Sequence, residues 1–401
     1  MSMARCFLAT ALCSAALSAH GADSISEIAI AKPGVFHHLD ASGRNSLAVT
    51  GASVGLVWED NRSGAPSCYL AFKGAGANGF REFPFGQGEC FEPAIAALDA
   101  DRFLLIWEDA SGVNTSIADA SGPGPASRLA DGGGQGTVTF HPKLGAVAAW
   151  SAPDGRWRRV WLAPLQIAGR QIHAGPARPV DAVPTSDDQT FPVLAAAAQG
   201  LTVAWEDRRH GHTVIFSSFS SDPGGAAQSW SVPTRVSGNP TGKAQGDLGR
   251  GTGAMRPVLA PFGNRLAAAW LDKRDFLSGY DVYAALTDKD SLRFAKDKKA
   301  QDSFGDAIAQ WHVAAAGNAH GELVLAWDDE RDGTADIWLT RLTATGYGEN
   351  FTLPAASGPG QQSDPAIALD AAGNLHLAWI ERGGDGATRV RYTHWPLPPL
   401  K

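Results

Sequence analysis

Several features that would mark a membrane protein, a nucleic-acid-binding protein or a common type of enzyme are missing from this sequence. Its 401 residues contain no apolar run of the roughly 18 residues that a membrane-spanning helix requires. The 34 basic residues are outnumbered by 41 acidic ones and form no cluster, which argues against a nucleic-acid surface. Motifs for haem attachment, a phosphate-binding loop and a His-Glu-x-x-His metal site are also missing. We therefore expect a soluble protein with no membrane span, no nucleic-acid partner and no cofactor.

The sequence contains only four cysteines, and two of them lie in a predicted signal peptide. Residues 1–21 combine one positive charge, a short apolar stretch and small residues before Ala22, which is typical of a signal peptide. Removal of this segment would leave two of the four cysteines, Cys68 and Cys90. Cysteines in an oxidising compartment are usually paired. We expect an exported protein, periplasmic or extracellular, with a Cys68–Cys90 disulfide.

Repetition is the strongest signal in the sequence. Seven of the thirteen tryptophans follow a small or branched apolar residue and, in most copies, precede an acidic residue by two positions. They are Trp58, Trp107, Trp150, Trp205, Trp270, Trp327 and Trp379, 43 to 65 residues apart. Such spacing is typical of propeller blades, four-stranded sheets that bury their faces only against neighbouring blades. We predict an all-β, seven-bladed β-propeller that forms one domain over residues 22–401.

The ends of the chain are expected to close the ring. The last unit shows only three alternating strands before the chain ends at Lys401. A strand-like segment, Ser26–Lys32, precedes the first unit and can supply the missing strand by pairing with Thr388–Trp395. Such pairing would remove an open sheet edge. The least regular stretches, Asn239–Ala254 and Thr287–Asp306, are expected to be long surface loops.

Charged residues are concentrated in the loops of one face of the predicted ring. The loops between the second and third strands of each blade emerge on the same face as the loops between blades, and this face is named the top. An acidic residue stands two positions after Trp in six of the seven units. A single ligand on the axis would not require the same chemical group from six directions, so these acidic residues are not the best functional candidates. We expect each of them to bind N–H groups of its own turn or the loop arginine, while the Trp packs between blades. The alternative interpretation is that these acidic residues face the central pore and form an acidic rim around it.

Residues that break the repeat are the better functional candidates. Thirteen to fifteen positions before each Trp, where the innermost strand begins near the channel mouth, the units hold seven different residues: Asn45, Glu92, Gln135, Phe191, Arg256, His312 and Asp364. We predict ligand binding by four of them, Glu92, Arg256, His312 and Asp364. Four residues of adjoining top loops are added to this prediction: Asp187, Asp188, His210 and Arg250. Ordinary solvated loops are the alternative interpretation.

Two parts of the chain carry a family resemblance: Ala204-Trp-Glu-Asp-Arg-Arg-His210, and Asp364-Pro-Ala-Ile-Ala followed by Ala378-Trp-Ile-Glu-Arg382. In these parts the chain resembles the sialidase-like superfamily of secreted β-propellers. The segment from Ser220 to Trp230 resembles one stretched Asp-box of these families. The resemblance implies a glycan ligand and arginines that grip a substrate carboxylate. Sialidases usually have six blades and an Arg-Ile-Pro motif, neither of which is found in this sequence. Met255-Arg256-Pro257 is the nearest match, so only Arg256 can be carried over.

Recognition is the expected function. No asymmetric set of nucleophile, acid and base can be assembled from motifs, and Tyr280 is expected to be a packed aromatic rather than a nucleophile. The acidic loop Asp328–Gly333 suggests calcium but lacks the spaced ligands of a calcium loop, so no metal site is expected. We predict a monomeric module that binds a glycan or a protein at its top mouth. A sialidase-like glycoside hydrolase or another glycan-processing enzyme is the alternative.

Overall fold

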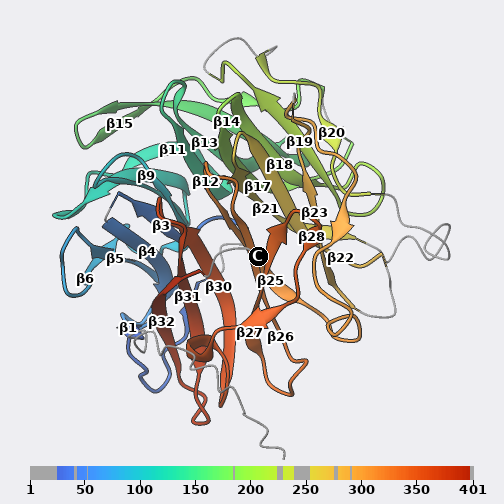
Figure 1. The fold of residues 1–401 in the computed structure, drawn as a ribbon. Helices are drawn as coiled ribbons and strands as arrows, with labels where there is room; N and C mark the ends of the chain where they lie inside the picture. The colour runs from blue at the N-terminus through green and yellow to red at the C-terminus, as the bar shows by residue number, and fades with distance from the viewer. Residues whose placement is uncertain are drawn as a thin grey trace, which may run out of the picture.

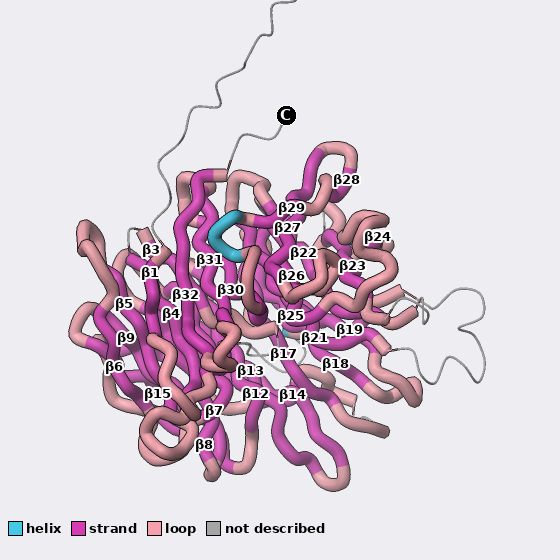
Figure 2. Tube along the Cα trace, turned by 90° about the horizontal axis from the view of Figure 1, so that it is seen from below, coloured by secondary structure: helices cyan, strands magenta, loops and turns pink. Residues whose placement is uncertain are grey.

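Nearly all regular structure in this protein is β-strand. The computed structural model describes residues 25–39, 43–51, 53–183, 186–223, 229–238, 253–274, 279–289 and 291–397. Figure 1 shows seven antiparallel sheets that follow one another around a ring, and strands dominate the view in Figure 2. The predicted all-β, seven-bladed propeller is confirmed. Within the described ranges, no helix has the length and apolar character needed to span a membrane.

The first four blades follow the chain from its N-terminal part. Blade 1 contains β2 (His37–His38), β3 (Leu47–Thr50), β4 (Ser53–Asp60), β5 (Ser67–Lys73) and β6 (Arg81–Phe85). Blade 2 contains β7 (Phe91–Ala97), β8 (Phe103–Asp109), β9 (Gly112–Asp119), β10 (Gly122–Pro123) and β11 (Ser127–Asp131). Blade 3 contains β12 (Gly134–His141), β13 (Gly145–Asp154), β14 (Trp157–Ala168), β15 (Gln171–Ala174) and β16 (Arg178–Pro179). Blade 4 contains β17 (Gln189–Ala197), β18 (Gly200–Asp207), β19 (Val214–Ser220) and β20 (Thr234–Arg235).

The last three blades complete the ring. Blade 5 contains β21 (Ala254–Phe262), β22 (Arg265–Asp272), β23 (Asp281–Leu286) and β24 (Lys298–Lys299). Blade 6 contains β25 (Trp311–Gly317), β26 (Leu323–Asp329), β27 (Asp336–Thr343), β28 (Gly346–Tyr347) and β29 (Phe351–Thr352), followed by a short 3-10 helix, Pro354–Ala356. Blade 7 contains β30 (Gln361–Leu369), β31 (Asn374–Arg382), β32 (Thr388–Pro396) and β1 (Ser26–Ala29).

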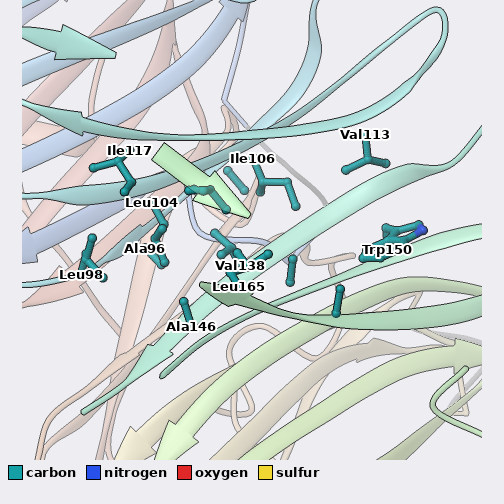
Figure 3. Close-up of a cluster of buried hydrophobic side chains, with 14 of the residues drawn as sticks. Ala96, Leu98, Leu104, Ile106, Val113, Ile117, Val138, Ala146, Trp150 and Leu165 are labelled. Atoms are coloured by element: carbon teal, nitrogen blue, oxygen red, sulfur yellow. The ribbon is translucent and has the colours of Figure 1, made fainter. Parts of the chain in front are cut away.

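Each interface between neighbouring blades has an apolar cluster with one of the repeated tryptophans. Between blades 2 and 3, Trp150 packs in a cluster with Leu104, Ile106 and Val138 (Figure 3). The repeated tryptophan of every other blade packs in the same way against the preceding blade. These side chains are buried, as predicted. Because a single blade would leave both faces exposed, the closed ring is the unit that buries them.

The acidic residue two positions after Trp holds the top loop of its own blade, as predicted. In blade 4, Asp207 accepts hydrogen bonds from Trp205 Nε1 at 3.0 Å and from the Arg209 N–H at 3.0 Å. The Arg209 guanidinium also donates to this carboxylate. The same contacts recur around the equivalent carboxylates of blades 1, 5 and 6, which are Asp60, Asp272 and Asp329. These repeated carboxylates therefore maintain the scaffold.

The chain ends meet in blade 7. Strand β1 pairs antiparallel with β32, with Ser26 opposite Tyr392 and Ala29 opposite Val390. Figure 1 shows the blue N-terminal strand beside the red C-terminal strands. The predicted closure of the ring by the N-terminal segment is confirmed.

The predicted disulfide is present between Cys68 in β5 and Cys90 just before β7, with Cα atoms 5.5 Å apart. It links blade 1 to the start of blade 2. The expectation of a long surface loop over Thr287–Asp306 is wrong in part, because β24, the outer strand of blade 5, lies inside it. Two residues of strand are too few to give a visible alternation. The other expected loop, Asn239–Ala254, lies almost entirely outside the described residues.

The innermost strands enclose a channel of about 300 Å³ that is lined mainly by Ala and Leu. The segment 43–46, which leads into β3, crosses the top mouth of this channel. Gly43 has φ +88°, and a Cβ there would stand 2.1 Å from the carbonyl oxygen of Pro257 in blade 5. Arg44 extends to Glu92 of blade 2 and to the carbonyl oxygen of Gly136 in blade 3. A ligand arriving at the top therefore meets this segment before the channel.

Candidate functional site

Six of the seven repeat-breaking residues share an unusual backbone conformation. They have φ between 49° and 57° and are Glu92, Gln135, Phe191, Arg256, His312 and Asp364. Each lies at a β-bulge in the innermost strand of its blade. A left-handed backbone is uncommon for residues with a side chain, and bulges at rims change the direction in which a side chain points. We name these six residues the mouth ring.

Carboxylates of the preceding blade hold most of these bulges in place. The Arg256 N–H donates to Glu206 Oε1 at 2.7 Å, and the Asp364 N–H donates to Asp328 Oδ1 at 3.1 Å. Glu59 and Glu108 accept the corresponding N–H groups of blades 2 and 3. All four acceptors directly follow a repeated Trp. Burial raises the pKa of the Glu206 carboxyl group above its ordinary value.

His312 is the centre of an acid–base group. Its Nδ1 lies 2.7 Å from Asp328 Oδ1, and its Nε2 lies 3.6 Å from Asp364 Oδ1. When the Asp328 carboxylate is ionised it can only accept a hydrogen bond, so Nδ1 then donates to it and Nε2 of the neutral imidazole carries no proton. The Asp328 side chain is 6% exposed, whereas the imidazole is 36% exposed. Burial raises the pKa of Asp328, although the hydrogen bond from His312 opposes this effect. A carboxylate behind an imidazole is an arrangement that orients histidine as a general base.

Arg256 provides a cationic group in the blade beside the one that carries His312. It lies in blade 5, and its Cζ is 3.7 Å from the centroid of the Phe191 ring. Phe191 in turn donates its N–H to Gln135 Oε1 at 2.9 Å. The Nη1 atom of Arg256 is buried and has no hydrogen-bond partner. A guanidinium with an unused donor is suited to a carboxylate or phosphate.

Arg44 was not among the residues selected from the sequence, whereas its neighbour Asn45 was. The Arg44 side chain is fully buried and forms an ion pair with Glu92, whose side chain is 26% exposed. Arg44 stands 14 positions before Trp58, the spacing that Phe191 and Arg256 have from their own Trp, but Asn45 was selected in this unit. Asn45 lines the channel, but it lacks the positive φ of the mouth ring, and its carbonyl oxygen accepts the N–H of Ile95 at 2.8 Å.

The other predicted ligand-binding residues have local contacts where the structure describes them. Asp188 accepts the N–H of Arg158 at 2.8 Å, and Asp187 accepts the N–H of Asp188 at 2.8 Å. His210 stacks on an aromatic ring of its own blade. Arg250 lies outside the described residues. Ligand binding by these four residues stays a prediction.

The structure shows the contacts of two features discussed in the sequence, Tyr280 and the acidic loop Asp328–Gly333. Tyr280 packs against Trp311 with ring centroids 5.2 Å apart, as expected for a packed aromatic. In the acidic loop of blade 6, Arg331 donates to both oxygens of Asp329. That carboxylate is thus engaged with an arginine, as in the other top loops.

A group of metal-ligating residues lies at the other end of blade 7. Asp370, His376 and His394 each place one ligand atom within 4.8 Å of the others. Asp370 is in the turn between β30 and β31, which belongs to the face opposite the mouth ring. No metal site was expected from the sequence. The feature that could have indicated one is the presence of two histidines at positions that are mostly apolar in the other units.

No family model and no curated protein matches the chain. A solved structure of the polysaccharide lyase Uly1 is similar over 88% of this chain and 89% of its own, with a TM-score of 0.60 and 9% identity. The α-L-arabinofuranosidase Arb93A from Fusarium graminearum matches 75% of this chain and 91% of its own (TM-score 0.47, 12% identity). An α-L-arabinanase from Penicillium chrysogenum matches 90% and 98% (TM-score 0.47, 12% identity).

None of the three is described as a sialidase. The sialidase-like resemblance is not confirmed and stays a pattern-level prediction. At 9% identity, the likeness to the lyase shows a shared propeller fold and no more.

Proposed function

We propose that this protein is a glycan-processing enzyme that binds an acidic glycan at the mouth ring and uses His312 for proton transfer. The observation that carries the proposal is the half-exposed imidazole of His312, oriented by the buried carboxylate of Asp328, in the blade next to Arg256. The fold shared with a polysaccharide lyase is compatible with this activity. Export through residues 1–21 belongs to the proposal, and the Cys68–Cys90 disulfide supports it because such bonds persist in oxidising compartments.

The residues of the mouth ring suit β-elimination at a uronic acid. Arg256 would bind the sugar carboxylate through its unused Nη1 donor and stabilise the negative charge that develops there. His312 Nε2 would take the proton from the carbon next to the carboxylate, and Asp328 would stabilise the resulting imidazolium. The bond from the neighbouring carbon to the glycosidic oxygen then breaks, a carbon–carbon double bond forms, and water protonates the leaving oxygen. No step requires an oxidant, a reductant or a second substrate.

Recognition without turnover is the second candidate. The segment 43–46 favours it, because only a cavity of about 20 Å³ remains where this segment meets blades 5 to 7. A glycan would then rest on the top surface, held by Arg256, and no reaction would follow.

The test is a panel of uronic-acid polysaccharides, sialosides and neutral glycans incubated with the purified mature protein. Elimination is detected by the ultraviolet absorbance of the unsaturated product, and hydrolysis by new reducing ends without that absorbance. We expect elimination with a uronic-acid polysaccharide. Arg256→Ala should reduce kcat/KM by at least ~100-fold, because the carboxylate loses a charged hydrogen bond and its transition-state stabilisation.

The matched control is His173→Ala, a change to an exposed residue on the outer strand β15. It should keep the wild-type rate. Binding of an acidic glycan without turnover would replace the proposal with recognition. Turnover that survives Arg256→Ala unchanged would show that the carboxylate is bound elsewhere.

A further inference from the structure

We propose that Asp370, His376 and His394 form a Zn²⁺ site at the bottom of blade 7. His376 on β31 and His394 on β32 are directly opposite each other in the strand register. Asp370 Oδ2 lies 3.6 Å from His376 Nε2 and 3.8 Å from His394 Nε2. With metal–ligand bonds of about 2.1 Å, ligand atoms of a tetrahedral zinc ion are about 3.4 Å apart. Small side-chain shifts would therefore bring all three atoms into coordination.

The buried histidine has an unused nitrogen that faces this site. His376 is 6% exposed, and its Nε2 is buried without a hydrogen-bond partner. Its Nδ1 lies 2.7 Å from the hydroxyl oxygen of Tyr392, which fixes the orientation of the ring. A buried polar atom that lacks a partner is costly, and a metal ion at this position would satisfy it.

The two histidines break the sevenfold repeat at one strand-pair position. The residue three positions before the repeated Trp is His376 in blade 7, and its cross-strand partner is His394. In blades 1 to 6 the same pairs are Gly55 with Phe72, Leu104 with Ile117, Val147 with Pro164, Thr202 with Phe219, Ala267 with Leu286, and Val324 with Arg341. Neither member of those pairs is a histidine, an acid or a cysteine. The scaffold therefore does not require these two imidazoles, and a ligand would explain them.

The third ligand is already oriented. Asp370 accepts the N–H of Ala372 at 2.9 Å and the Nδ2–H of Asn374 at 2.8 Å. A hydrogen-bonded carboxylate and a histidine held through its other nitrogen are typical supports of metal ligands.

The donor set determines which metal is expected. Two imidazole nitrogens and one carboxylate oxygen favour Zn²⁺ over Ca²⁺ or Mg²⁺, which prefer oxygen ligands. The His394 side chain is 45% exposed, so solvent can reach the site and water can complete the coordination. A bound ion would join the β30–β31 turn to β31 and β32 in the blade that closes the ring. Zinc should therefore raise the unfolding temperature.

The experiment uses protein without a histidine tag that has been freed of metal with a chelator. Calorimetric titration with ZnCl₂ should give about one ion per chain, and thermal unfolding with and without ZnCl₂ should show a rise in Tm. CaCl₂ should do neither. His394→Ala and Asp370→Asn should weaken binding by at least ~100-fold, and Tyr392→Phe by ~10–100-fold through loss of the support for His376.

His173→Ala, which removes an exposed histidine far from blade 7 in sequence, should bind zinc like the wild type. Circular dichroism of each metal-free variant checks that the fold is kept; His394→Ala is the least disruptive because its side chain is half-exposed. Failure of the wild type to bind zinc would overturn the proposal. So would wild-type affinity in His394→Ala, since the ion would then be bound elsewhere.

Discussion

Neighbouring carboxylates of one top loop have opposite electrostatic environments. Asp207 accepts hydrogen bonds from Arg209 and Trp205, whereas Glu206, one residue earlier, accepts the backbone N–H of Arg256. Burial alone would raise the pKa of both groups. For Asp207, the hydrogen bonds from Arg209 and Trp205 outweigh burial and lower the pKa, whereas the pKa of Glu206 stays above its ordinary value. Asp207 therefore stabilises the fold in its ionised form.

Replacement of Asp207 tests this. Asp207→Asn should lower the free energy of unfolding at pH 7 by about 2–4 kcal/mol, because Trp205 and Arg209 lose a charged acceptor. Since the folded-state pKa lies below the unfolded value, this stabilisation is present above about pH 4 and is lost as the pH falls further. Denaturant unfolding at pH 7 and pH 3 should show a smaller wild-type-to-variant difference at pH 3. Asp131→Asn, at a carboxylate that is 92% exposed, is the control. Equal differences at both pH values would contradict the prediction.

Single residues were predictable from the sequence where the repeat provided a comparison. The mouth ring emerged because Arg256 and His312 stand at positions whose counterparts differ in every unit. Its left-handed backbone could not be predicted, because residues with side chains rarely adopt it. Arg44, 14 positions before Trp58, was missed because Asn45 was selected in its unit. The pair His376 and His394 was missed because their proximity depends on strand register, which the spacing of tryptophans does not determine.

At the scale of elements, the ring is closed by one short strand and linked by one disulfide. Strand β1 was predictable because the last unit lacks a fourth strand and the N-terminal segment alternates. Strand β24 was not, since two residues carry no recognisable pattern. The Cys68–Cys90 pair could be assigned because the antiparallel meander brings the start of β5 and the end of β6 to the same face.

Removal of the disulfide should destabilise the protein. Cys68→Ser combined with Cys90→Ser should lower the free energy of unfolding by about 3 kcal/mol, because a closed loop of 22 positions no longer restricts the unfolded chain. Thermal unfolding with and without a reductant measures this. The wild type should lose stability on reduction, and the double variant should not respond to the reductant. A variant as stable as the oxidised wild type would refute the prediction.

For the whole molecule, a sevenfold scaffold carries two asymmetric groups at opposite faces. Repetition of Trp and its partner Asp explains the ring, and therefore the architecture could be predicted from spacing alone. A candidate site could be predicted at the mouth, but its chemistry could not, because the distances between His312, Asp328 and Asp364 depend on three separate strands. The sequence analysis favoured recognition for lack of an acid–base set. The group around His312 is such a set, and it is the reason why we propose an enzyme.

The most direct test of this account is the initial rate of uronic-acid polysaccharide turnover by three proteins: the wild type, His312→Ala and His173→Ala. If His312 transfers the proton, His312→Ala should reduce kcat by ~10²–10⁴-fold, while the unfolding temperature stays close to that of the wild type. His173→Ala should retain full activity. A His312→Ala protein that is as active as the wild type, or a wild type that turns over none of these polysaccharides, would contradict the central claim that the mouth ring is an active site.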